Sequence, residues 1–225
     1  MRKLVLVSIS LVLLAVGASP ASAAIVPCGT TTLDTLIGAG NGCSIQDKVF
    51  TNFAYTTGAG GKPATAVEVQ TVFTTAGPTS EIHGFIFSPV NNTGTWTVGF
   101  TLSYNISVDP AFPGVTIIAS KDQINTGLTP NGTVMTDTQT FGTIVTNGLA
   151  VANETNQISF AGATSVDTSS VLTLGAGNQL VSFEQDFFET VPGPAVPEPA
   201  TLLLLGSGLV AAGVFGRKRL GGRKA

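Results

Sequence analysis

Apolar and polar residues alternate with a period of two through much of the chain from residue 47 onward. The longest alternating segment is 95–109, in which seven apolar residues share one face of an extended chain. They are Trp96, Val98, Phe100, Leu102, Tyr104, Ile106 and Val108. This pattern predicts an antiparallel strand whose apolar face lies in the core, because so many exposed apolar groups would aggregate. A strand from Trp96 to Val108 would be about 40 Å long, so we expect a bend, with a bulge at Gly99.

Other segments of the same kind are also predicted as strands, and turn clusters rich in Gly, Pro and Asn separate them. The predicted strands are 48–55, 65–74, 81–87, 115–120, 133–146, 157–163, 171–174 and 179–188. Between residues 24 and 195 the only helical pattern is a short turn over residues 32–37, which Gly38 would end. Many short strands between such turns are typical of an all-β sandwich or barrel. We predict an antiparallel β-sandwich.

The beginning of the chain has the pattern of an export signal. Two basic residues precede an apolar run over 4–16, and an Ala-x-Ala site ends at Ala23. This order is typical of a secretory signal peptide, so we expect cleavage between Ala23 and Ala24. The alternative is an uncleaved N-terminal anchor, but the apolar run is too short to span a bilayer. The predicted organisation is therefore a signal peptide at 1–23 and one exported all-β domain at 24–195.

The last segment, 196–225, combines a proline-rich spacer, an apolar stretch and a basic end. The apolar stretch predicts a transmembrane helix at about 200–216, followed by a basic tail that favours the cytoplasmic side. The tail begins with Arg217, Lys218 and Arg219. The 16 residues from 200 to 215 would form about 24 Å of helix, whereas the hydrocarbon core is about 30 Å thick. The span is therefore short for a permanent anchor, which is the alternative interpretation.

The order of these features resembles the PEP-CTERM sorting signal of exported bacterial proteins. Pro197, Glu198 and Pro199 begin the signal, one hydrophobic span follows, and a basic cluster ends it. The resemblance implies that an exosortase, a membrane-embedded transpeptidase-like enzyme, processes the chain near these prolines. It also implies delivery from a membrane-anchored precursor to the cell surface or extracellular matrix. Because such proteins are associated with bacteria that make exopolysaccharide, the resemblance further implies a role in a biofilm and exopolysaccharide as a partner.

The start of the predicted domain carries a second resemblance. The stretches Gly42-Cys43-Ser44-Ile45 and Asp47-Lys48-Val49-Phe50 are similar to the beginning of many uncharacterised PEP-CTERM proteins. This resemblance implies kinship of the domain but no defined activity.

The charge of the domain argues against nucleic acid as a partner. Residues 24–195 contain three lysines, no arginine and twelve acidic residues, a net charge of about −9. A nucleic-acid-binding domain needs cations that neutralise phosphates, and this domain lacks them.

The two cysteines, Cys28 and Cys43, are fifteen residues apart. In an exported protein this pair predicts a disulfide, which would contribute about 3 kcal/mol. A redox or metal pair is the alternative.

Candidate chemistry is sparse. His83 is the only histidine and lies in an apolar segment, so we expect a structural role. No Gly-x-Ser-x-Gly or phosphate-binding loop is present. Two carboxylate pairs could in principle act as in glycosidases, but we expect solvated charges. The pairs are Glu184 with Asp186 and Asp122 with Asp137.

We therefore predict no catalytic residue, metal or cofactor. The leading hypothesis is a non-enzymatic protein of the cell surface or matrix, processed by an exosortase. The alternative is a secreted carbohydrate-binding or carbohydrate-acting β-sandwich, and a third possibility is a permanently anchored structural subunit.

Overall fold

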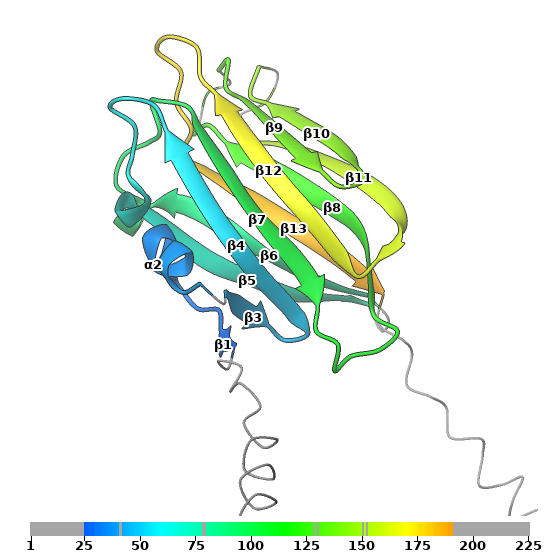
Figure 1. Ribbon diagram of the computed structural model, residues 1–225. Coiled ribbons are helices and arrows are strands. Elements are labelled where there is room, and N and C mark those ends of the chain that lie inside the picture. The colour runs from blue at the N-terminus through cyan, green and yellow to red at the C-terminus, as the bar shows by residue number, and fades with distance from the viewer. Residues whose placement is uncertain are drawn as a thin grey trace, which may run out of the picture.

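Two sheets, antiparallel except at one edge, pack face to face and form a β-sandwich in the computed structural model (Figure 1). The structure describes residues 25–40, 42–77, 80–127, 129, 131–149, 151 and 153–190. The predicted all-β sandwich is thus confirmed. The signal peptide with Ala23 and Ala24, the helix at 200–216, the motif at 197–199 and the basic tail lie outside these residues. Within the described ranges, no helix is long and apolar enough to cross a membrane.

One sheet has seven strands in the order β1–β3–β4–β7–β12–β9–β10. They are β1 (Val26–Pro27), β3 (Cys43–Ile45), β4 (Lys48–Thr57), β7 (Phe100–Val108), β12 (Ser165–Thr173), β9 (Val134–Gln139) and β10 (Gly142–Asn147). Neighbouring strands are antiparallel except for β1 and β3, which are parallel.

The other sheet has six strands in the order β11–β8–β13–β6–β5–β2, and all neighbours are antiparallel. They are β11 (Asn153–Ala163), β8 (Thr116–Asn125), β13 (Ser182–Thr190), β6 (Ser80–Pro89), β5 (Val67–Gly77) and β2 (Thr31–Thr32). Short 3₁₀ turns, Ala64–Ala66 and Val90–Asn92, flank β5 and β6. The helical turn predicted at 32–37 is confirmed as α2 (Leu33–Gly38), which buries Leu33 and Leu36.

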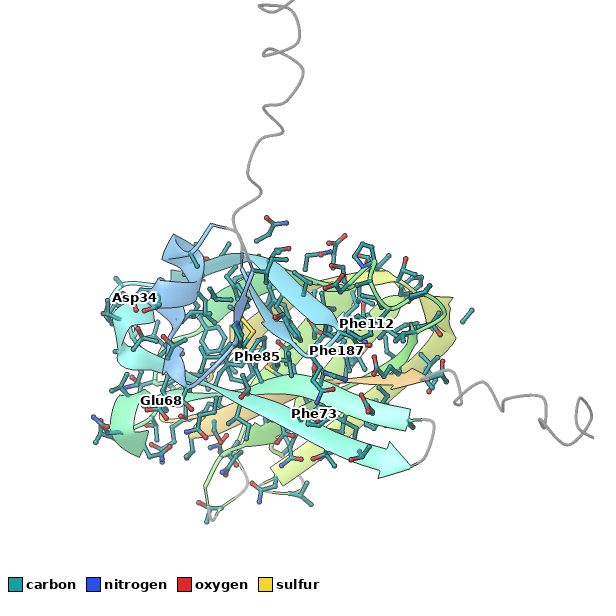
Figure 2. The ribbon with its side chains drawn as sticks, turned by 90° about the horizontal axis from the view of Figure 1, so that it is seen from below. Asp34, Glu68, Phe73, Phe85, Phe112 and Phe187 are labelled. Carbon is teal, nitrogen blue, oxygen red and sulfur yellow. A yellow bond between two sulfur atoms is a disulfide. The ribbon has the colours of Figure 1, made fainter. Side chains whose placement is uncertain are left out.

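Aromatic side chains from both sheets fill the space between them. The rings of Phe50 and Phe85 are 4.5 Å apart, and those of Phe87 and Phe183 are 4.6 Å apart. Phe85 and Phe187 lie between the sheets in Figure 2. The predicted inner face of segment 95–109 is confirmed at the positions that the core encloses. Those buried positions are Trp96, Phe100, Leu102, Tyr104 and Ile106.

Segment 95–109 does not form one continuous strand. The strand β7 begins only at Phe100, and Trp96 instead forms an isolated bridge with Leu180 before β13. Gly99 is not a bulge within the strand: a Cβ atom there would lie 2.4 Å from the carbonyl oxygen of Leu172. The chain turns at this close backbone approach, which only glycine allows.

Two other strand predictions needed correction. The segment 133–146 is a hairpin, because β9 and β10 pair with Gln139 opposite Gly142 across a two-residue turn. Strand β12 is longer than the predicted 171–174. Its buried positions include Thr168 and Ser170, so hydroxyl groups interrupt the apolar alternation by which a strand is recognised.

The predicted disulfide between Cys28 and Cys43 is present. It joins the residue after β1 to the first residue of β3, at the edge of the seven-stranded sheet. Cys43 is buried and packs with the hydrophobic core, so the crosslink ties the start of the domain to the sandwich.

Candidate functional site

A polar groove crosses the outer face of the seven-stranded sheet. It has a volume of about 620 Å³ and lies over β4, β7, β12 and β9. We call it the outer groove; its lining residues are Asn52, Ser103, Tyr104, Asn105, Thr138, Gln139, Thr140, Asp167, Thr168 and Ser169. Among them Tyr104 alone is aromatic, and it is 3% exposed because it belongs to the core. The groove therefore offers hydrogen-bonding groups without an exposed ring.

A β-bulge in β4 shapes one side of this groove. The pairing of β4 with β7 shifts between Thr51 and Ala54, and Asn52 has φ of 58°. Asparagine tolerates this left-handed conformation better than most residues. The bulge lets Phe50 and Phe53 both reach the core, while Asn52 stays exposed and lines the groove.

The groove contains a preformed hydrogen-bonded pair. The side-chain amide of Asn105 donates to the carboxylate of Asp167 over 2.7 Å and to the hydroxyl of Ser165 over 3.0 Å. The backbone N–H of Asp167 also donates to the hydroxyl of Thr140. These contacts hold a carboxylate and an amide at fixed positions, a geometry suited to a ligand rich in hydroxyl groups.

Beneath the groove, the space between the sheets holds a buried polar network around two aspartates. We call it the aspartate network; it consists of Tyr104, Ser120, Asp122, Asp137, Gln139, Thr168, Ser170 and Gln185. The oxygens of Asp137 accept hydrogen bonds from Thr168, Ser170 and Gln139.

Asp122 accepts fewer hydrogen bonds than Asp137. Its Oδ1 accepts from the Gln185 amide over 3.3 Å, but Oδ2 has no hydrogen bond. Burial, followed by the nearby Asp137, raises the pKa of Asp122 well above its ordinary value. A protonated carboxyl there would remove one of two negative charges from a site enclosed by both sheets.

A second buried group of charged side chains lies at the end of the core, beside the last residues of β13. We call it the histidine cluster; it consists of Asp47, Lys48, Glu81, His83 and Glu189. The turn between β3 and β4 supplies Asp47, and β4 begins at Lys48. The lysine ammonium binds Asp47 over 2.9 Å and also binds Glu189.

His83 faces the three carboxylates of this cluster. Its Nε2 lies 3.1 Å from Glu189, 3.5 Å from Glu81 and 3.6 Å from Asp47. Burial, and then the charge of Lys48, lowers the pKa of His83 to about 4. Burial likewise lowers the pKa of Lys48, although its hydrogen bond to Asp47 opposes this effect.

The carboxylate pairs considered from the sequence are mostly not solvated. Asp122 and Asp137 come together inside the sandwich. There they accept hydrogen bonds from amide and hydroxyl groups instead of lining a cleft. Glu184 and Asp186 both lie beside Lys121, and Asp186 is 1% exposed. Burial, and then a hydrogen bond with Asp186, raises the pKa of Glu184 to about 7.

The histidine cluster was not predicted from the sequence. Glu81 and Glu189 are more than a hundred residues apart, yet they are direct partners across β6 and β13. The available signal was the period of two: Glu81 and His83 share a strand face with Phe85 and Phe87, which are buried.

Comparisons with known proteins bear on the end of the chain and on the fold. A family model described as the PEP-CTERM protein-sorting motif matches residues 195–219. No curated protein matches the chain. The residues matched by the family model include Pro197, Glu198, Pro199 and the basic residues 217–219.

Solved structures similar to the chain include two structures of family 11 carbohydrate-binding modules. One is the solution structure of CtCBM11, with 15% identity and a TM-score of 0.32 over 77% of this chain and 99% of that one. Another is the family 11 module of the cellulase Lic26A-Cel5E of Clostridium thermocellum, with 13% identity and a TM-score of 0.28 over 75% and 96%. TM-scores this low carry no functional information. The chain is thus identified by its C-terminal segment, as one that carries a PEP-CTERM protein-sorting motif at residues 195–219.

Proposed function

We propose that this chain is an exported, non-enzymatic protein of the cell surface or extracellular matrix, sorted and processed by an exosortase. The observation that carries the proposal is the sorting motif at 195–219, which follows β13 after only a few residues. In this arrangement the sandwich is the cargo and the motif is the part that the enzyme recognises. The short apolar stretch holds the precursor in the membrane until processing.

The chemistry of the described residues supports a role other than catalysis. Both cysteines are joined in a disulfide. His83 is buried among carboxylates, and no serine or threonine hydroxyl is hydrogen-bonded to it in the described ranges. Asp167 in the outer groove already accepts a hydrogen bond from Asn105. A nucleophile next to a free base is thus missing from this part of the chain.

Replacement of Pro197, Glu198 and Pro199 by alanine tests the proposal. The variant is expected to accumulate unprocessed in the membrane fraction of the native host, because the enzyme loses the residues that mark the site. The intact mass of wild-type protein from the cell surface should begin at Ala24 and lack residues 217–225. A matched variant with alanine at Pro192 and Pro194, outside the motif, should be processed normally. A motif variant processed like the wild type, or a wild-type mass that retains the basic tail, would refute the proposal.

The outer groove favours a second candidate function, the binding of a glycan. Its carboxylate, amide and hydroxyl groups match the many hydroxyls of a polysaccharide, and a cavity of about 620 Å³ accommodates a few sugar rings. Exopolysaccharide of the host is the corresponding ligand.

Replacement of Asp167 with alanine is expected to weaken exopolysaccharide binding at least about tenfold. A hydrogen bond to a charged group contributes about 1.5–3 kcal/mol, and about 1.4 kcal/mol corresponds to tenfold in affinity. Affinity electrophoresis in gels containing the polysaccharide measures the effect. The control is Gln157→Ala, an exposed position on β11 of the other sheet. Equal retention of the two variants and the wild type would argue against the groove as the site.

A further inference from the structure

The charges of the histidine cluster do not balance. With His83 counted as neutral, three carboxylates face one lysine ammonium, which leaves a net charge of −2. The side chains of Asp47 and Glu189 are 7% and 0% exposed, and that of Glu81 is 22% exposed. Buried charges are costly unless they are paired. A single divalent cation would neutralise the cluster.

The strand register places two of these negative charges directly opposite each other. Glu81 and Glu189 are direct partners across β6 and β13, and like charges at such positions destabilise a sheet. Lys48 contacts Glu189 and Asp47 through their Oε2 and Oδ2 atoms. The opposite oxygens, Oε1 and Oδ1, face His83 instead. The lysine therefore binds the carboxylates from one side and leaves their other side to the histidine.

Ligand atoms converge on the side that faces His83. One ligating atom from each of Asp47, Glu81, His83 and Glu189 lies within 4.8 Å of the others. The three oxygens are 3.1–3.6 Å from Nε2, and a tetrahedral ion with bonds of about 2.0–2.1 Å separates its ligands by about 3.3 Å. Asp47 Oδ1 is buried and has no hydrogen bond, so one of the converging atoms lacks a partner.

We propose that the histidine cluster binds one divalent transition-metal ion, with Zn²⁺ as the best match. The imidazole and three carboxylates are ligands that Zn²⁺ accepts, while Lys48 stays outside as a charge partner of two of them. Asp47 lies in the turn between β3 and β4 of the seven-stranded sheet, and the other three ligands belong to the six-stranded sheet. The ion would therefore connect the two sheets beside the residue at which β13 ends.

The proposal is tested with the full-length chain, purified in detergent and stripped of metal with a chelator. Calorimetric titration with ZnCl₂ at pH 7 is expected to give one ion per chain and a higher melting temperature. Because His83 is the only histidine and both cysteines are in the disulfide, other strong Zn²⁺ ligands are scarce. Substitution with Co²⁺ should give the absorption of a four-coordinate site.

Two variants separate a built site from adventitious binding. His83→Gln and Glu81→Gln should each lower the affinity for Zn²⁺ at least tenfold, whereas Glu154→Gln, an acidic residue on β11, should not. Glu81→Gln also removes a negative charge, so its melting temperature without metal should equal or exceed that of the wild type. With Zn²⁺ present, the wild type should have the higher melting temperature of the two. Absence of one-to-one binding, or equal binding by all variants, which is the result for an adventitious ion only, would overturn the proposal.

Discussion

Replacement of Lys48 with methionine is expected to lower the free energy of unfolding by about 3–5 kcal/mol, in metal-free protein with a chelator present. The lysine is fully buried and binds both Asp47 and Glu189. Methionine keeps the apolar stem but removes the ammonium, so the neighbouring carboxylates lose the cation that compensates them. Loss of one partner from a buried ion pair costs this much because the other charge stays behind.

Urea denaturation followed by circular dichroism measures this change. The matched control is Lys62→Met, which removes the same charge at a position outside the histidine cluster and should change stability by less than about 0.5 kcal/mol. If the Lys48→Met substitution changed stability as little as the control, Lys48 would not act as the charged partner of these carboxylates. In that case the net charge of −2 inferred for the cluster would be wrong.

Replacement of Asp122 with asparagine is expected to make the domain more stable at neutral pH and to flatten the dependence of stability on pH. The folded state raises the pKa of Asp122 well above 3.8, mainly through burial and then through Asp137. Above the ordinary pKa the unfolded chain loses this proton while the folded chain keeps it. The contribution of Asp122 to stability is therefore fully present below its pKa in the unfolded chain, and it is lost as pH rises toward its pKa in the folded chain. The slope reaches up to about 1.4 kcal/mol per pH unit for one proton.

Denaturation curves from pH 3 to pH 8 separate this contribution from others. Asparagine retains an acceptor for Gln185 and carries no charge, so the variant should match the wild type at the acid end and exceed it at neutral pH. Glu184→Gln is the control, because the pKa of Glu184 is raised to about 7 and contributes its own slope between about pH 4.5 and 7. If Asp122→Asn kept the full pH dependence of the wild type, or destabilised the domain at pH 7, Asp122 would be charged in the folded state.

The apolar pattern predicted the fold better than it predicted the strand boundaries. The inner face from Phe100 to Ile106 is correct because its apolar residues belong to the same buried core as apolar residues of the other sheet. The pattern could not show that the backbone of Gly99 approaches Leu172, since that contact depends on a strand more than seventy residues away. Nor could it separate β9 from β10, whose two-residue turn contains neither glycine nor proline.

Buried polar groups account for most of what was missed. Asp137 shares an inward face with Met135 and Gln139, but threonines on either side give no apolar contrast that would reveal this face. In β8, the pairing with β13 shifts near Ala119, so that Ile117 and Asp122 both point inward although their spacing is odd. A bulge of this kind changes the face of every later residue. The aspartate network therefore requires the register, which only the structure gives.

The position of β13 has a mechanical consequence. This strand lies between β8 and β6, and it is hydrogen-bonded to both almost from end to end, up to Thr190. A force applied to the chain beyond Thr190 would pull along the strand, at right angles to both sets of hydrogen bonds. Both ladders would then have to shear together, instead of opening one bond at a time as at a sheet edge. The domain is thus built to bear tension at the end that leads to its sorting motif.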